Sequence, residues 1–497
     1  MTPIFRTAGI RAIESRHAHL PLMERAGEAV AEAAVEMLGD AGEAPPVLIV
    51  AGPGNNGGDG FVCARLLKTR GINPVVLFAG SENRLPPDAR AAFDAWKATG
   101  GETLTEISAY PSHKFSLAID ALFGIGLARP IEGLHAQLVE AINGLGCPVL
   151  AVDIPSGLCA DTGRTLGNAV RASRTATFIG LKPGLLTLDG PDFCGDLRVF
   201  DLGLDAKEPE GRIVSANLFR GYLRPRPKNS HKGSFGAAGI LGGAPGMAGA
   251  ALLAGRTALK LGAGCVYVGM MDRMAVDPAQ PELMLREAGE VFGSATALVI
   301  GPGLGRSKTA LELLRRALDA PQPLVVDADG INLLAEHPVL LNRLGRREFP
   351  TILTPHPLEA ARLLKTDTTA IQGDRIAAAL ELALRSRAFV ALKGCGTVIV
   401  SPPRSKNQLA TSENQWFINT TGNPGLATAG SGDVLAGILV ALLAQGWPAR
   451  EALICAVHLH GTAADTLVAK GIGPIGLVAG ELIDDARTLL NHWIASA

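Results

Sequence analysis

The sequence has almost no net charge, no close cysteine pair and no long apolar run. Its 46 Lys and Arg residues nearly balance 47 Asp and Glu residues, which leaves a net charge of −1. A chain without a basic field is not drawn electrostatically to nucleic acid or to anionic lipid. We therefore expect neither nucleic acid nor a membrane among its partners.

The seven cysteines are scattered, and no two of them form a C-x-x-C pair. This spacing indicates reduced, mostly buried thiols in a cytoplasmic protein, and it offers no thiolate zinc site. The N-terminal segment lacks the continuous apolar stretch of a secretory signal. The most apolar stretch, Val434 to Leu443, is too short to span a bilayer. The sequence thus predicts a cytoplasmic protein.

The composition is that of a folded globular protein, with 47% hydrophobic and 19% charged residues. Its 497 residues exceed one ordinary core, so two domains are expected, joined by a charged, proline-rich linker at 203–228. Short apolar runs alternate with amphipathic segments, which predicts an α/β fold with largely parallel sheets. The expected strands lie at 46–51, 74–79, 116–120, 148–153 and 175–180 in the first half. Those of the second half lie at 237–243, 265–270, 297–301, 323–329, 351–355, 390–394 and, as a hairpin strand, 397–402.

The densest glycine motif is GPGNNGGDG at 52–60, between a strand and a helix expected at 59–70. Five glycines in nine residues would allow positive φ and a close approach to a phosphate. The helix start beyond would present free N–H groups to an anion. A tight turn that needs glycine only for its geometry is the alternative explanation.

Polar residues follow three strands of the first half, at Asp120, at Asp153 and at Lys182. A carboxylate at the end of an apolar strand is costly to bury unless it binds a cation, a proton or a ligand. Asn56, Asp120 and Ser156 offer hard oxygen ligands suited to an alkali or alkaline-earth cation. Lys182 is interpreted either as a solvated surface lysine or as a ligand contact.

Three motifs, GPGNNGGDG, DALFGIGL and VDIPSGLCADTG, together resemble the N-terminal domain of the NAD(P)H-hydrate epimerases, and LMERAG at 22–27 is similar to their leading helix. The resemblance covers residues 1–215 and implies a Rossmann-like domain. It implies that a hydrated dinucleotide is bound by Asn55, Asn56, Gly57, Gly58, Asp59, Gly124, Ile125, Gly126, Leu127, Ala128, Arg129 and Pro130. It also implies Asp153 at the reacting ring and a potassium ion held by Asn56, Asp120 and Ser156. Ala51 stands where the family motif leads us to expect Cys, a change that affects packing more than chemistry.

Epimerisation at C6 of the hydrated ring requires loss of a hydroxyl group beside the ring nitrogen and addition of water on the other face. A single carboxylate can serve both proton transfers. We therefore assign Asp153 as the general acid and base.

The second dense motif is GNPGLATAGSGD at 422–433. Gly430 to Gly432 are expected to open a helix whose free N–H groups hold a transferring phosphoryl group. Asp433 would accept the proton of the attacking hydroxyl. The alternative is a glycine-rich helix start in which Asp433 only stabilises the helix dipole.

Further motifs end neighbouring strands of the second half. They are Gly301–Gly305, Asp327–Asn332, Thr354–Glu359 and Lys393–Thr397. An isolated histidine such as His356 is more often structural, but its place between a strand end and a helix start favours a substrate contact.

These motifs, with HKGSFG at 231–236 and GMAGAALLAGRTALKLGAG at 246–264, resemble the ribokinase-like C-terminal domain of the ADP-dependent NAD(P)H-hydrate dehydratases, over residues 222–497. The resemblance implies that Ala250, Gly305 and His356 contact the hydrate and that Asp433 lies at the reacting hydroxyl. It implies an adenine nucleotide, ADP, held by Lys393, Gly394, Cys395, Gly396, Thr397 and Gly432. Mg²⁺ is expected from the phosphoryl chemistry alone, with no ligands identified. Two departures are Leu358, where Gly is expected and which could narrow the pocket, and Gly330 in place of an expected Ala.

The sequence therefore predicts a bifunctional enzyme, an isomerase and a lyase, that acts on NADH hydrate and NADPH hydrate. We expect a homo-oligomer. One alternative is a ribokinase-like small-molecule kinase with a regulatory N-terminal domain. A second, a non-enzymatic scaffold, is disfavoured because the site residues of both halves are intact.

Overall fold

The computed structural model describes residues 2–39, 45–105, 115–403 and 416–497 and divides into two compact units. One unit is formed by Thr2–Gly211 and the other by Arg212–Ala497. The boundary lies within the charged segment 203–228, where the sequence predicts a linker. That segment contains the short strand β9 (Gly211–Ile213) and two 3-10 turns, η5 (Ala216–Leu218) and η6 (Arg220–Tyr222).

The first unit is built on a parallel sheet in the order β4-β3-β2-β5-β6-β7-β8. Its strands are β2 (Val47–Ala51), β3 (Pro74–Phe78), β4 (Thr103–Leu104), β5 (Leu117–Ala121), β6 (Val149–Val152), β7 (Arg174–Phe178) and β8 (Asp196–Phe200). The chain adds β3 and β4 on one side of β2 and then continues with β5 on the other side. Such a reversal opens a crevice at the carboxyl ends of the two central strands, where α/β proteins bind ligands.

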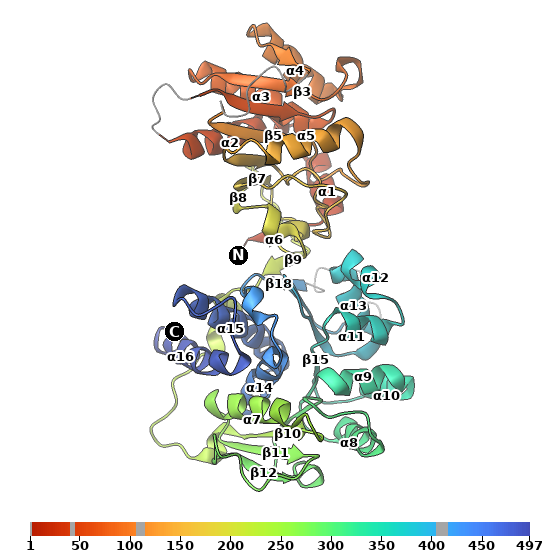
Figure 1. Ribbon diagram of the computed structural model, residues 1–497. Helices are drawn as coiled ribbons and strands as arrows, with labels where there is room; N and C mark the ends of the chain where they lie inside the picture. The colour runs from red at the N-terminus through yellow and green to blue at the C-terminus, as the bar shows by residue number, and fades with distance from the viewer. Residues whose placement is uncertain (1, 40–44, 106–114, 404–415) are drawn as a thin grey trace. The chain divides into compact units, whose positions relative to one another are not determined.

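Helices cover both faces of this sheet (Figure 1). They are α1 (Thr7–Arg16), α2 (Leu22–Leu38), α3 (Asn55–Thr69), α4 (Pro87–Ala98), α5 (Gly133–Asn143) and the short α6 (Gly190–Phe193), and β1 is Pro3–Ile4. Val47 and Ile49 of β2 belong to one buried cluster, whereas Leu48 and Val50 belong to another. Because both faces are buried, the strand is a continuous apolar run without polar alternation.

The sheet of the second unit has the order β9-β18-β17-β16-β15-β14-β13-β10-β11-β12. Its other strands are β10 (Ala237–Gly242), β11 (Cys265–Met270), β12 (Met284–Glu287), β13 (Ala297–Ile300), β14 (Leu324–Val326), β15 (Thr351–Leu353), β16 (Phe389–Leu392), β17 (Thr397–Val400) and β18 (Trp416–Asn419). Strands β10 to β16 pair in parallel, and β16, β17 and β18 pair antiparallel. The strand order reverses between β10 and β13, which places a second crevice at their carboxyl ends.

The helices of this unit form two groups on either side of its sheet (Figure 1). One group contains α7 (Ala248–Lys260), α14 (Ser431–Ala444), α15 (Ala449–Ala469) and α16 (Leu482–Ala495). The other contains α8 (Lys308–Asp319), α9 (Ala328–Glu336), α10 (Pro338–Leu344), α11 (Pro357–Leu364), α12 (Thr368–Gly373) and α13 (Arg375–Ser386). Helix α14 is buried on all sides from Val434 to Ala444 and forms the centre of the core.

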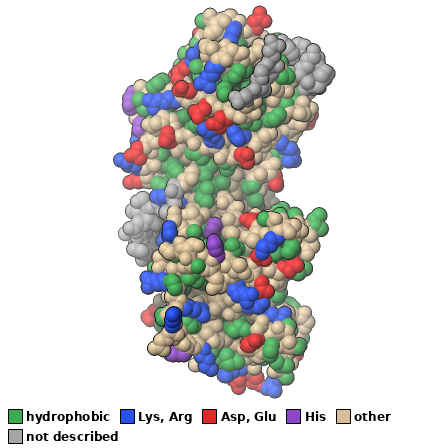
Figure 2. Space-filling model, turned by 90° about the vertical axis from the view of Figure 1, so that its left-hand side faces the viewer, with side chains coloured by type: hydrophobic (Ala, Val, Ile, Leu, Met, Phe, Trp, Pro, Cys, Tyr) green, Lys and Arg blue, Asp and Glu red, His purple; other side chains and the backbone are tan. Residues whose placement is uncertain are grey.

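By length and composition alone, α15 could cross a membrane, and 67% of its most apolar window is buried within the unit. Its buried hydrophobic residues belong to the same cluster as α14, so it is packed as a core helix. On the face of the molecule shown in Figure 2, basic and acidic side chains are mixed, as the net charge of −1 leads one to expect.

The α/β class and the strands predicted at 46–51, 265–270 and 397–402 are confirmed, with ends that differ by a few residues at most. The helix predicted at 59–70 is wrong at its start, because α3 already begins at Asn55. The prediction of positive φ for the glycines of the 52–60 motif is also wrong, since all five of these described residues lie outside the left-handed region.

Candidate functional site

The crevice of the first unit is a cavity of about 1140 Å³. Its wall is formed by the turn after β2, the segment 122–129 after β5, Asp153 after β6, and residues of α1 and α2. Of the residues predicted to bind the dinucleotide, those in the wall are Asn55, Asn56, Asp59, Gly124, Ile125, Gly126, Leu127, Ala128 and Arg129. The described lining also contains Arg11 and Glu14 of α1, for which the sequence gives no recognisable motif.

Gly57, Gly58 and Pro130 were predicted as contacts, but they are not part of the cavity lining. Gly57 and Gly58 lie buried in the first turn of α3. A Cβ atom on Gly57 would lie 2.0 Å from the carbonyl oxygen of Gly52, and one on Gly58 would lie 2.6 Å from Met23. Glycine is therefore required here for close packing of the turn, which is the alternative that the sequence left open.

We expect Gly57→Ala to destabilise the first unit by about 1–3 kcal/mol, because the added methyl group overlaps the backbone of Gly52. Gly54→Ala is the matched control, since a Cβ at this extended residue has no neighbour within 4 Å. Chemical denaturation of both variants measures the difference. Equal stability of the two variants would show that the turn has room for a side chain.

Asp153 follows β6, and its backbone is in the left-handed region with φ of 67°. Non-glycine residues are uncommon there and occur often at functional sites. The side chain of Asp153 lines the cavity and forms an ion pair with Lys182, which is fully buried. Lys182 Nζ also donates to Thr177 Oγ1 at 2.8 Å and to Phe178 O at 3.0 Å. The interpretation of Lys182 as a solvated surface lysine is therefore wrong, because these partners compensate for its desolvation.

Asp120 is the fourth residue of β5 and is fully buried. Its Oδ2 accepts from Ser156 N at 2.7 Å, and its Oδ1 accepts from Ser156 Oγ at 2.6 Å. Burial raises the pKa of Asp120 to about 6, although the hydrogen bonds from Ser156 oppose this shift. Asn56 is also buried, and its amide nitrogen has no hydrogen-bond partner among the described residues. A Cβ atom on Gly124 would lie 2.9 Å from Asn56 Oδ1, so the amide faces the segment after β5.

In the second unit, the segments that follow β10 and β13 lie in contact with each other. Ala244 N donates to Gly303 O at 2.6 Å, and a Cβ atom on Gly303 would lie 3.1 Å from the Cβ atom of Ala250. Gly305 has φ of 72°, and its N–H donates to Asp329 Oδ2 at 2.9 Å. Ala250 and Gly305, both predicted to contact the hydrate, thus belong to neighbouring parts of the chain, the start of α7 after β10 and the segment after β13.

A helix, α14, begins at Ser431, as the GSGD motif predicts. Gly430 precedes the helix with φ of 88°, and Asp433 is in its first turn. A Cβ atom on Gly432 would lie 3.4 Å from Lys393 Nζ and 3.7 Å from Asp327 Oδ2. Burial raises the pKa of Asp433 to about 6, and the negative charge of Asp327 contributes to the shift.

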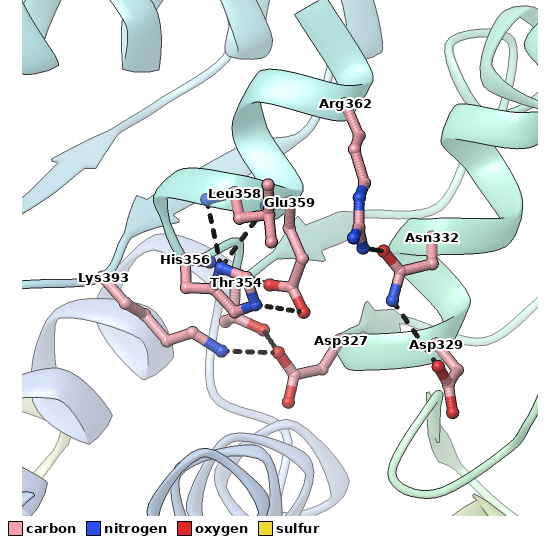
Figure 3. A network of polar contacts seen from close by, with 9 residues as sticks. All are labelled: Asp327, Asp329, Asn332, Thr354, His356, Leu358, Glu359, Arg362 and Lys393. Carbon is pink, nitrogen blue, oxygen red and sulfur yellow. Dashed lines mark hydrogen bonds and ion pairs between the residues drawn. The ribbon is translucent and has the colours of Figure 1, made fainter. Parts of the chain in front are cut away.

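Asp327 connects three elements of the site in the network of polar contacts shown in Figure 3. Its Oδ1 accepts from Thr354 Oγ1 at 2.7 Å and from Lys393 Nζ at 2.9 Å. Glu359 lies beside them, and its burial raises the pKa of the carboxyl to about 7. The sequence identified the motifs of this network but gave no role to Asp327 or Glu359.

His356 caps the N-terminus of α11 (Figure 3). Its Nδ1 accepts from the amides of Leu358 at 3.1 Å and Glu359 at 3.3 Å, while Glu359 Oε2 accepts from His356 N at 2.8 Å. The pKa of His356 is lowered, chiefly by burial. The histidine therefore has a structural role in addition to any contact with substrate.

The two departures from the family pattern differ in their surroundings. Leu358 is 44% exposed. Gly330 is buried in α9, and a Cβ atom there would lie 2.8 Å from Val326 Cγ1 and 2.9 Å from Ile300 O. In this chain Gly330 lets α9 pack closely against two strands.

The segment from Lys393 to Thr397 forms the turn of the hairpin between β16 and β17, as predicted. Gly394 and Gly396 have φ of 145° and 66°, and Thr397 Oγ1 donates to Gly394 O at 3.1 Å. Cys395 is exposed at the tip. Lys393 thus reaches the N-terminus of α14 from one end of this turn. In the described part of the chain, no cluster of three or more His, Cys, Asp or Glu side chains is arranged to hold a metal ion.

Two protein families match the chain. Residues 19–184 match the family described as YjeF-related protein N-terminus, and residues 238–484 match NAD(P)H-hydrate dehydratase. The bifunctional NAD(P)H-hydrate repair enzyme Nnr of Escherichia coli K12 is 38% identical over 482 residues, 95% of this chain and 89% of that protein. The protein of the same name from Coxiella burnetii is 37% identical over 512 residues, 99% of this chain and 100% of its own length. The solved ADP/ATP-dependent NAD(P)H-hydrate dehydratase of Bacillus subtilis is 30% identical, covers 57% of this chain and 99% of its own, and has a TM-score of 0.48.

Proposed function

The chain belongs to the family of bifunctional NAD(P)H-hydrate repair enzymes, and from this premise we propose that each of its two units carries one activity. The enzyme interconverts the R and S epimers of NADH hydrate and NADPH hydrate, and it dehydrates the S epimer to the reduced dinucleotide. Epimerisation belongs to the first unit, and dehydration belongs to the second. The observation that carries the assignment is an acidic side chain near the carboxyl-terminal edge of each sheet, the buried Asp153 in one unit and the partly buried Asp433 in the other.

In the first unit, the hydrated nicotinamide ring lies against Asp153, and the rest of the dinucleotide lies along Asn55, Asn56 and Asp59 and along the segment 124–129. Asp153 donates a proton to the departing C6 hydroxyl, so that water leaves with the help of the ring nitrogen. Water then adds to the opposite face, and its proton returns to the carboxylate. Lys182 fixes the position of that carboxylate through the buried ion pair.

The residues Asn56, Asp120 and Ser156 suit a potassium ion. All are buried, all carry oxygen atoms, and no Lys or Arg among the described residues pairs with Asp120. In Asn56 the ligand of the ion would be the carbonyl oxygen Oδ1, whereas the unpartnered Nδ2 is a donor that is left for a hydrogen-bond acceptor. The ion would supply a positive charge close to the substrate and to the buried carboxylate.

Epimerisation is therefore expected to depend on K⁺, and dehydration by the second unit is not expected to depend on it through this site. Replacing Asp120 by Asn should raise the K⁺ concentration for half-maximal epimerisation by roughly 10- to 100-fold. Rates measured in K⁺ or tetramethylammonium salts at constant ionic strength test this. Identical epimerisation rates in both salts would show that the enzyme does not use potassium at this site.

In the second unit, Asp433 removes the proton of the C6 hydroxyl as a phosphoryl group is transferred to that oxygen. The amides at the start of α14 stabilise the charge on the phosphoryl oxygens. Phosphate is a far better leaving group than hydroxide, so the ring nitrogen can expel it, and loss of a proton from C5 restores the double bond. Ala250, Gly305 and His356 hold the hydrate.

The phosphoryl donor of this step is ADP, held by Lys393–Thr397 and Gly432. The short distance between Gly432 and Lys393 Nζ supports one shared phosphate site. Mg²⁺ on the nucleotide would neutralise the charge of the phosphoryl group.

The chain acts in the cytoplasm as a homo-oligomer, without nucleic acid or a membrane among its partners. Light scattering of the purified protein tests its oligomeric state.

The full function is tested with a mixture of both NADH hydrate epimers, Mg²⁺ and K⁺, in the presence of ADP, ATP or no nucleotide. Return of the absorbance of reduced nicotinamide reports dehydration, and chromatography reports the epimers. Complete consumption of both epimers with ADP is the expected result. If no nucleotide restores NADH and the epimers never interconvert, the repair function is wrong and the second unit should be screened as a small-molecule kinase.

A further inference from the structure

Arg375 is a buried cation that the chemistry above does not use. It is the first residue of α13 and is only 3% exposed. Its Nη1 donates to Gln372 Oε1 at 2.7 Å, and its Nη2 donates to Leu392 O at 3.1 Å and Lys393 O at 3.2 Å. Nε is buried without a hydrogen-bond partner among the described residues. These contacts are all neutral.

A buried guanidinium normally has a carboxylate partner, because removing its charge from water is costly. In the described part of the chain, no carboxylate lies within ion-pair distance of Arg375. Burial lowers the pKa of Arg375 to about 10, which still leaves the side chain positively charged at neutral pH. The structure therefore retains an unpaired positive charge in its interior.

The charge lies directly beneath the turn proposed to hold the nucleotide. A Cβ atom on Gly394 would be 2.8 Å from Arg375 Nη2, so glycine is required for this approach. Gly394 itself is exposed, which leaves a single layer of backbone between the guanidinium and a ligand on the turn. Because only this backbone separates the two, the electrostatic field of the guanidinium extends to a ligand on the turn.

Lys393 lies at the start of the same turn, but Asp327 already pairs with its ammonium group. Arg375, by contrast, has no carboxylate partner among the described residues, and the titratable group that acts on it is the thiol of Cys395 on the same turn. An anionic ligand would supply the missing countercharge.

We propose that Arg375 is a positioning residue of the dehydratase, which shapes the turn Lys393–Thr397 and attracts the phosphates of the adenine nucleotide through it. This inference rests on the proposed nucleotide site of the second unit. The guanidinium does not touch the reacting atoms. It increases affinity for nucleotides in proportion to their negative charge.

The test is isothermal titration of the full-length protein with adenosine, AMP and ADP, without hydrate. Arg375→Gln is expected to weaken ADP binding at least tenfold and AMP binding less, with little change for adenosine. The KM for ADP should rise accordingly, while kcat changes little. Arg375→Lys should recover part of the affinity, because it restores the charge but not the planar hydrogen-bonding geometry.

Arg385→Gln is the matched control, because Arg385 is on the same helix but pairs with Glu381 in solvent. Epimerase activity and the melting temperature show whether each variant is folded. Equal losses for adenosine, AMP and ADP, or unchanged ADP binding in folded Arg375→Gln, would overturn the inference. If wild-type protein binds ADP but never restores NADH, the proposed function fails separately, and the binding series still decides the role of Arg375.

Discussion

Replacing Asp433 by Asn is expected to lower kcat of ADP-dependent dehydration by about three orders of magnitude. The amide preserves the shape of the side chain at the start of α14 but cannot accept the proton of the C6 hydroxyl. Epimerisation in the first unit should continue at the wild-type rate. The measurement is recovery of NADH absorbance from purified S epimer with saturating ADP. Asp367→Asn is the control, since Asn can also cap the exposed start of α12.

The same carboxyl predicts the pH dependence of dehydration. Its pKa is raised to about 6, and only the ionised form can act as a base. The rate of dehydration should therefore be maximal at pH values above this pKa and should fall about tenfold per pH unit below it. A rate that is independent of pH between 5 and 8, or an Asp433→Asn variant with normal turnover, would exclude Asp433 as the base.

Lys182→Met is expected to destabilise the first unit by about 3–5 kcal/mol, because Asp153 loses its partner in a buried environment. Epimerisation should also slow strongly in any folded fraction, since the carboxylate is no longer held in place. Chemical denaturation and chromatography of the epimers measure the two effects. Lys260→Met, which removes an exposed partner of Asp484, should cost about 1 kcal/mol or less.

The double variant Lys182→Met/Asp153→Asn separates charge from packing. Removing both charges should recover part of the lost stability, whereas the loss would simply add if the two side chains acted independently. Epimerisation should remain slow in the double variant because the proposed acid–base group, Asp153, is absent. Additive losses of stability would show that the ion pair is not the reason for the burial of Lys182.

The sequence was sufficient to predict where ligands could bind, because polar and glycine residues lie at the ends of apolar strands at 52, 120, 153 and 301, and a glycine at 430 precedes a helix. In parallel sheets the carboxyl ends of the strands lie at one edge, so residues at those ends are brought together. The domain families were also predictable, since several spaced motifs occur in a fixed order. These inferences depend on local pattern and need no knowledge of packing.

Other features depend on contacts distant in sequence and could not be predicted. Nothing near Lys182 indicates that its ammonium group meets Asp153, which lies 29 residues earlier. The glycines at 57 and 58 suggest flexibility, but contacts with Gly52 and Met23 give them a packing role. Arg375 has the sequence context of an ordinary charged residue at a helix start, and only its burial distinguishes it.

Helix α14 carries Asp433 at one end and is enclosed by core residues from Val434 onward. A change along this helix would disturb the packing of the whole unit, so natural variation should be rare there. The hairpin turn 393–397 has two exposed residues and belongs to no such core. Under the proposed function, preference among phosphoryl donors can therefore change through this turn over evolutionary time, while the proposed base, Asp433, stays in place.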